Sequence, residues 1–258
     1  MTTEQFLLRG WTWGGCSLPM GAAVLVCYLV AFGFQRRFSC FAAALGLTLL
    51  TLRSPINSLA DGYLFSAHML QHLILLLIVP ALAMLSLPRS LSLAMRPRVL
   101  GHPLFGWIAG VGAMWLWHAP ALCNAAVSSR SVHALQTVSL LAMGGLFWRQ
   151  ILAPRESERL APPSAILYLF SACVTCSILG IIVTFSPVEV CSIYSAPPID
   201  RLGLLQFVRA GWGMTPERDQ QVGGLLMWVP MCLIYLSAIV VQIARWFAAT
   251  EGPLAEKL

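Results

Sequence analysis

Long apolar segments, separated by short polar or proline-containing connections, run along almost the entire chain. A helix needs about 20 mostly apolar residues to cross the hydrocarbon core of a bilayer, and segments near this length recur throughout. We therefore predict an all-α membrane protein, a polytopic bundle of seven transmembrane helices that forms a single transmembrane domain over residues 1–258. The predicted spans are residues 18–34, 38–52, 64–87, 103–121, 132–152, 163–185 and 221–247.

The composition agrees with a membrane protein. Of the 258 residues, 58% are hydrophobic and only 10% are charged, whereas soluble domains carry about 25% charged residues. The formal net charge is +6, from 16 Lys and Arg against 10 Asp and Glu. The basic residues lie in connecting loops, where they set topology rather than bind nucleic acid. We expect the lipid bilayer as a partner and no nucleic acid.

The distribution of Lys and Arg predicts how the helices are oriented. If the N-terminus lies outside, the inner segments hold ten basic residues and the outer segments hold six. Cytoplasmic loops carry an excess of Lys and Arg. The bias therefore predicts an N-out, C-in topology.

Four of the five histidines fall where three of the predicted spans reach the outer side. His68 and His72 have the i,i+4 spacing that places two rings on one helix face. His118 ends the next span and His133 opens the one after, whereas His102 lies in an inner loop. Ionisable side chains inside a membrane are costly and usually functional. These four residues therefore predict a ligand site on the outer side.

The residue types at this site favour copper. Imidazole binds zinc, copper, iron and nickel, and a thioether adds a preference for cuprous copper. Met114 lies four residues before His118, on the same helix face, and is a candidate ligand with packing as its alternative role. Met69 follows His68 but points about 100° away around the helix. We predict a metal site of His68, His72, His118 and His133, with Met114 as an optional ligand.

Polar residues near the predicted ligands could orient them. Asp219 is either an acidic residue at a helix N-terminus, with Thr215 as the cap, or a carboxylate that orients a ligand histidine. Gln220 and Gln71 are further candidates for this supporting role. Gly223 and Gly224 would allow another helix to approach closely.

Eight cysteines are too scattered for a disulfide framework. Cys173 and Cys176 fall in the middle of a predicted span, where cysteine behaves as a small apolar residue. A disulfide between Cys123 and Cys191 is possible in an oxidising compartment. The sequence leaves that pairing open.

Several motifs resemble those of the CtaG family. They are Ser66-Ala-His68-Met-Leu-Gln71-His72-Leu, Trp117-His118-Ala-Pro120, His133-Ala-Leu-Gln136, Gly145-Leu-Phe-Trp148 and Asp219-Gln220-Gln221-x-Gly223-Gly224-Leu-x-Met227-Trp228. The family comprises seven-helix membrane proteins associated with assembly of caa-type cytochrome c oxidase. The resemblance implies an assembly factor in the plasma (inner) membrane that helps supply copper from the outer, periplasmic face. An oxidase subunit would be its client.

The chain departs from the family pattern at two positions. The family commonly has a second histidine four residues after His133, where this chain has Thr137. It also commonly has an aspartate where this chain has Asn57. The loss of an imidazole predicts weaker metal binding or a different client.

Three functions remain open from the sequence, none of them enzymatic and none with catalytic residues. The first is a copper-handling assembly factor. The second is a membrane electron carrier with b-type haem, held by His72 opposite His118 or His133. The third is a metal transporter, which ranks last because the inner halves of the spans have few polar residues. A Soret band in the purified protein would favour haem.

Overall fold

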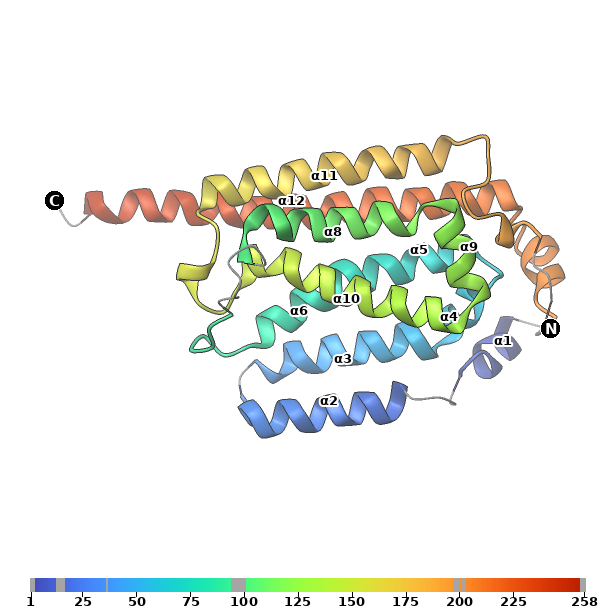
Figure 1. Cartoon of the computed structure of the whole chain (residues 1–258), viewed down its shortest axis with the longest axis horizontal. Coiled ribbons are helices and arrows are strands. Elements are labelled where there is room, and N and C mark those ends of the chain that lie inside the picture. The colour runs from blue at the N-terminus through green and yellow to red at the C-terminus, as the bar shows by residue number, and fades with distance from the viewer. Residues whose placement is uncertain are drawn as a thin grey trace.

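The computed structural model describes residues 3–12, 17–35, 37–93, 101–196, 200 and 203–255, and within them all regular structure is helical. The long helices run side by side along one axis (Figure 1). The elements are α1 (Thr3–Arg9), α2 (Ser17–Phe32), α3 (Phe38–Arg53), α4 (Pro55–Ala60), α5 (Phe65–Leu73), the π-helix η1 (Ile74–Ile78), α6 (Val79–Ser86), α8 (Pro103–Trp117), α9 (Pro120–Ser128), α10 (Arg130–Leu152), the 3₁₀ turn η2 (Glu156–Glu158), α11 (Pro162–Phe185), the 3₁₀ turn η3 (Ser192–Tyr194), the π-helix η4 (Phe207–Gly211) and α12 (Pro216–Ala255).

Three of the described helical stretches are long and apolar enough to cross a membrane. They are Phe65–Ser86, Pro162–Phe185 and Pro216–Ala249. Shorter apolar helices cover Leu18–Phe32, Phe38–Arg53 and Pro103–Trp117. Large apolar side chains are exposed on the outer faces of α2, α8, α11 and α12. In water such faces would be costly, whereas a bilayer accommodates them.

The helices begin and end close to the predicted spans, with three differences. One is that the last helix continues to Ala255, beyond the predicted end at residue 247. The predicted span 103–121 is interrupted, because α8 ends at Trp117 and α9 begins at Pro120. A proline disfavours the helical conformation of the residue before it, and Ala119 is extended. The last helix begins at Pro216 rather than at 221, with Thr215 as its cap: the hydroxyl of Thr215 accepts the N–H of Arg218.

A π-helical segment separates α5 from α6 and precedes Pro80. Because proline has no N–H, the carbonyl of Leu76, four residues earlier, receives no helical hydrogen bond from it. Gly144 of α10 packs directly on this carbonyl, and a Cβ at that position would overlap the Leu76 oxygen. This contact brings α10 close to the helix that carries His68 and His72.

The prediction of close packing at Gly223 and Gly224 is confirmed. A Cβ on Gly223 would lie 2.5 Å from the Phe65 ring of α5, and one on Gly224 would overlap Thr184 of α11. α12 therefore lies tightly between α5 and α11. α9, α4 and α1 gather at one end of the bundle, and the last turns of α12 extend beyond the other end (Figure 1).

Candidate functional site

Four histidines from three helices form a row of neighbouring rings at the end of the bundle near α9. On α5, the ring centroids of His68 and His72 are 4.5 Å apart. His118, directly after α8, lies 5.2 Å from His72, and His133, in the first turn of α10, lies 6.2 Å from His68. The order along the row is therefore His133, His68, His72 and His118.

Three of these imidazoles are removed from solvent, and two have nitrogens without partners. His68, His72 and His118 are 1%, 0% and 5% exposed. Neither nitrogen of His72 has a hydrogen-bond partner, nor does Nε2 of His68. A buried polar atom left unpaired costs about 1–3 kcal/mol and is uncommon in folded proteins. The row is therefore a candidate ligand site.

Gln136 joins this group, although sequence reasoning assigned it no role. Its side chain is 1% exposed and its Nε2 atom also has no partner. The amide faces His72 without reaching hydrogen-bond geometry. A signal was present in the sequence, because Gln136 lies three residues after His133 and shares its helix face.

The contacts of His118 fix its protonation pattern. Nδ1 lies 2.5 Å from the carbonyl oxygen of Met114. A carbonyl can only accept, and a neutral imidazole has a single N–H, so in the neutral ring the proton lies on Nδ1 and Nε2 presents a lone pair. That Nε2 lies 3.0 Å from Sδ of Met69, a thioether that has no proton to donate. Two acceptor atoms thus face each other.

The two methionines make different contacts with His118. Met69 lies next to His68 in sequence, but its sulfur reaches His118, directly after α8. Met114 contacts His118 through its backbone carbonyl, and its fully buried side chain belongs to the hydrophobic core. Sequence reasoning missed Met69 because a single helix does not reveal which side chains meet across helices.

Asp219 supports the site by holding a helix in place. Its Oδ2 accepts the N–H of Phe65 at 2.7 Å, and its Oδ1 accepts the N–H of Ser66 at 3.0 Å. These N–H groups lie in the first turn of α5, where the helix itself offers them no carbonyl partner. A residue of α12 therefore caps the helix that carries His68 and His72. The carboxylate acts on the α5 backbone, and no hydrogen bond or ion pair to an imidazole is found among the described residues.

The two predicted glutamines also tie elements together. Gln71 donates from Nε2 to the carbonyl of Thr51 and to Oδ1 of Asn57, at 3.0 and 3.1 Å. This contact joins α5 to α3 and α4, and an aspartate at position 57 could accept the same bond. Gln220 accepts the N–H of Val190 and donates to two carbonyls of the loop after α11, at Ser186 and Val188.

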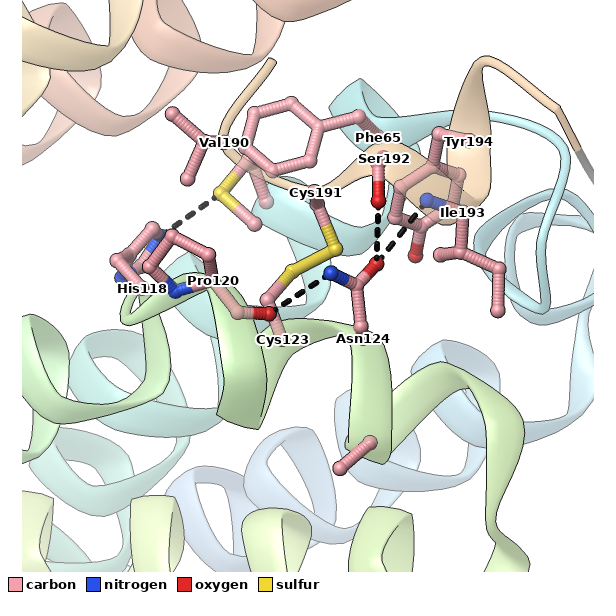
Figure 2. The surroundings of a disulfide bond; sticks show 12 residues. Phe65, His118, Pro120, Cys123, Asn124, Val190, Cys191, Ser192, Ile193 and Tyr194 are labelled. Atoms are coloured by element: carbon pink, nitrogen blue, oxygen red, sulfur yellow. Dashed lines mark hydrogen bonds between the residues drawn. A yellow bond between two sulfur atoms is a disulfide. The ribbon is translucent and has the colours of Figure 1, made fainter. Parts of the chain in front are cut away.

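A covalently fixed loop covers the histidines. A disulfide joins Cys123 of α9 to Cys191, and both residues are buried. Figure 2 shows this bond between the α9 ribbon and the loop that carries Tyr194, with His118 nearby. The Tyr194 ring lies 6.1 Å from the His68 ring, and its hydroxyl donates to the carbonyl of Ala60 at 2.7 Å. The pairing that the sequence left open is thus present, and it fixes the cover of the site.

The site is not a ready-made metal centre. In the part of the chain that the structure describes, no three His, Cys, Asp or Glu side chains are placed to hold a metal ion together. The donor chemistry nevertheless suits a soft or borderline metal, because unpartnered imidazole nitrogens lie beside a thioether. Holding an ion would require the imidazoles to reorient.

These features define a helical membrane protein that buries polar side chains at one end of its bundle. The chain matches the family model described as cytochrome c oxidase caa3 assembly factor over residues 26–249, and it belongs to this family. Comparisons with curated proteins and with solved structures find no match. The family predicted from the sequence motifs is confirmed.

Proposed function

We propose that the protein supplies copper for the assembly of cytochrome c oxidase, with an oxidase subunit as its client. Copper is cargo in this proposal and is held by the imidazoles of His68, His72 and His118 together with the thioether of Met69. His133 and Met114 remain candidate additional ligands. The assembly role rests on the family.

One observation supports the copper assignment above all. The lone pair of His118 Nε2 faces the Met69 sulfur at 3.0 Å, and neither atom has a proton to share. Two acceptors in contact gain stability when a cation binds both. A set of nitrogen and thioether ligands favours cuprous copper, and the neighbouring nitrogens of His72 have no competing partner.

The geometry disfavours haem between His72 and His118. His72 and His118 have ring centroids 5.2 Å apart with their planes at 87°. A porphyrin held by two axial histidines requires rings that face each other across a gap, and these rings are in edge contact.

We further propose seven transmembrane helices in the plasma membrane, N-out and C-in, with the site facing the periplasm. Two features support this orientation: the excess of Lys and Arg in the inner segments and the disulfide at the histidine end, because disulfides persist in oxidising compartments. A reporter fused after Leu258 should be cytoplasmic. An external reporter would refute the orientation.

The copper assignment is tested by His72→Leu in anaerobically purified protein. The change removes two unpartnered nitrogens and keeps an apolar side chain in the space, so the fold should survive. Affinity for Cu(I), measured by competition with a chelator, should fall about tenfold or more, and oxidase maturation in cells should fall with it. Copper binding and maturation at normal levels in this variant would refute the proposal.

His102→Asn is the matched control. The Nδ1 of His102 accepts the N–H of Leu104 and caps α8 at the opposite end of the bundle, and asparagine preserves an N-cap. This variant should bind copper as the wild type does. A loss of copper in His102→Asn alone would place the functional face on the other side.

A further inference from the structure

Three cysteines that the proposed function does not use lie between α11 and α12. Cys173 and Cys176 are on α11, and Cys232 is on α12. All three are free thiols. Taken alone, the Cys173-x-x-Cys176 spacing indicated packing. The structure adds Cys232 from the neighbouring helix, which changes the chemistry available at this position.

The sulfur atoms of Cys173 and Cys232 are in contact. Their Sγ atoms lie 3.4 Å apart, with the Cys173 thiol donating to Cys232. Ser177 donates its hydroxyl proton to the carbonyl of Cys173 at 2.7 Å, and its oxygen lies 3.1 Å from the Cys232 sulfur. Cys232 therefore donates to Ser177. Both thiols are protonated in this chain of hydrogen bonds.

The surrounding helices hold the two thiols side by side. A Cβ on Gly180 would lie 2.7 Å from Trp228, and one on Gly224 would overlap Thr184, so α11 and α12 are in close contact over several turns. Cys173 is buried, whereas Cys232 is partly exposed. An ion could reach the pair from the Cys232 side.

We propose that Cys173 and Cys232 form a second binding site, specific for a soft monovalent metal ion, Cu(I). Thiolate sulfur selects soft ions. Zinc sites and iron–sulfur clusters normally take four protein ligands, and no group of three His, Cys, Asp or Glu ligands is found among the described residues. Cu(I) accepts two ligands in a linear arrangement.

Binding of Cu(I) replaces one S–H bond by two metal–sulfur bonds. One Cu(I) ion replaces one thiol proton, which the basic ligand that delivers the ion takes up, so that one thiolate and one thiol bind the ion. The site then has no net charge, the form that a position among apolar helices favours. With metal–sulfur bonds of about 2.3 Å, as for zinc, a linear site places the sulfurs about 4.6 Å apart. The pair must separate by about 1 Å, which side-chain rotation can supply.

The site is tested by protection from alkylation in the full-length wild-type protein. The protein is purified anaerobically, loaded with Cu(I) or left free of it, and treated with a membrane-permeant maleimide, and each cysteine is then quantified by mass spectrometry. Bound Cu(I) should slow the labelling of Cys173 and Cys232 about tenfold. Cys27, an exposed free cysteine on α2, should react equally in both samples. Equal labelling of the pair with and without Cu(I) would overturn the proposal, as would isolation of the pair as a disulfide under these conditions.

Variants separate this site from the histidines. Cys232→Ser should abolish the ultraviolet thiolate-to-Cu(I) absorption while copper remains at the histidines, and Cys27→Ser should not change this absorption. His72→Leu should give the reverse result, with the sulfur absorption retained. If His72→Leu removed the sulfur signal and Cys232→Ser did not, no separate thiol site would exist. Failure of the histidine proposal would leave the thiol result unchanged.

Discussion

Arg149 and His133 lie on the same helix, α10, near opposite ends and about 24 Å apart at 1.5 Å per residue. Arg149 is 6% exposed and donates to the carbonyl oxygens of Leu93 and Gly101, at 2.9 and 3.2 Å. At the other end of α10, Nε2 of His68 and both ring nitrogens of His72 are buried without hydrogen-bond partners. The charged side chain hydrogen-bonds to the backbone of the fold, whereas these imidazole nitrogens bond to nothing in it.

The comparison separates structural from functional polar groups. Nearly all buried polar groups in folded proteins are paired, and the polar residues around the histidines follow this rule, as Asp219 and Gln71 show. The buried polar atoms without a partner lie mainly at the histidine end of the bundle. Of the five partnerless buried side-chain atoms in the described residues, four belong to His68, His72 and Gln136, and the fifth is Nε1 of Trp148. Pairing, rather than burial alone, distinguishes the candidate site.

Arg149→Leu should give the largest loss of stability. It leaves the carbonyl of Leu93 without its side-chain donor and leaves the carbonyl of Gly101 with only the longer bond from Gln150, at 3.5 Å. A buried acceptor that loses its partner costs about 1–3 kcal/mol, and the apolar replacement also removes the contacts that join α10 to Leu93 and Gly101. We expect the free energy of unfolding to fall by about 2–4 kcal/mol in detergent, with lower protein yield. Copper bound per folded molecule should not change.

The free energy of unfolding of His72→Leu tests the contrast between the paired Arg149 and the unpaired imidazole. Replacing an unpaired polar group by an apolar one can be neutral or stabilising, so stability should stay within about 1 kcal/mol of the wild type. If His72→Leu destabilised the protein as much as Arg149→Leu, the imidazole would be structural and the comparison would fail.

The positions of the helices could largely be predicted from the sequence, because the length of an apolar segment and the prolines at its ends are local properties. The break before Pro120 and the start of α12 at Pro216 follow from proline chemistry, yet hydropathy alone placed both boundaries a few residues away. The four histidines were identifiable because imidazoles are rare in apolar segments. Their position at the same side of the membrane followed from the fact that successive spans run in opposite directions.

Contacts between helices could not be read in this way. Whether Met69 or Met114 meets His118 depends on how α5 and α8 rotate about their axes, and Asp219 caps α5 only because Gly223 lets α12 approach. The partner of Cys123 lies 68 residues away in a loop, and no local signal selects it. Such pairings depend on packing over the whole bundle.

Gly144→Ala should have the next largest effect on stability, because Gly144 sets the distance between α10, which carries Arg149 and His133, and the helix that carries His68 and His72. Its added Cβ would overlap the Leu76 carbonyl oxygen and approach Pro80. Overpacking of this kind costs about 1–3 kcal/mol, and thermal unfolding should show it. Gly145→Ala is the matched control: its Cβ would meet only Met84 at 3.8 Å, and alanine favours helix. Equal destabilisation by both changes would show that helix packing at Leu76 is not the cause.

The smallest effect concerns Asp200, a paired carboxylate at the histidine end. Partial desolvation acts to raise its pKa, but hydrogen bonds from the Tyr63 hydroxyl and from the N–H groups of Leu205 and Leu204 outweigh it, so the pKa lies below the ordinary aspartate value. A carboxyl with a lowered pKa stabilises the fold fully above its ordinary pKa, and this contribution disappears as the pH falls through the folded value. Protection of the Leu204 and Leu205 amides from hydrogen exchange, corrected for the intrinsic rate, should therefore hold from neutral pH down to the ordinary aspartate range and be lost below it. Global stability should change by no more than about 0.5 kcal/mol. Asp200→Asn should show weaker protection that does not depend on pH, and an acid-induced loss of the same size in this variant would assign the transition to another group.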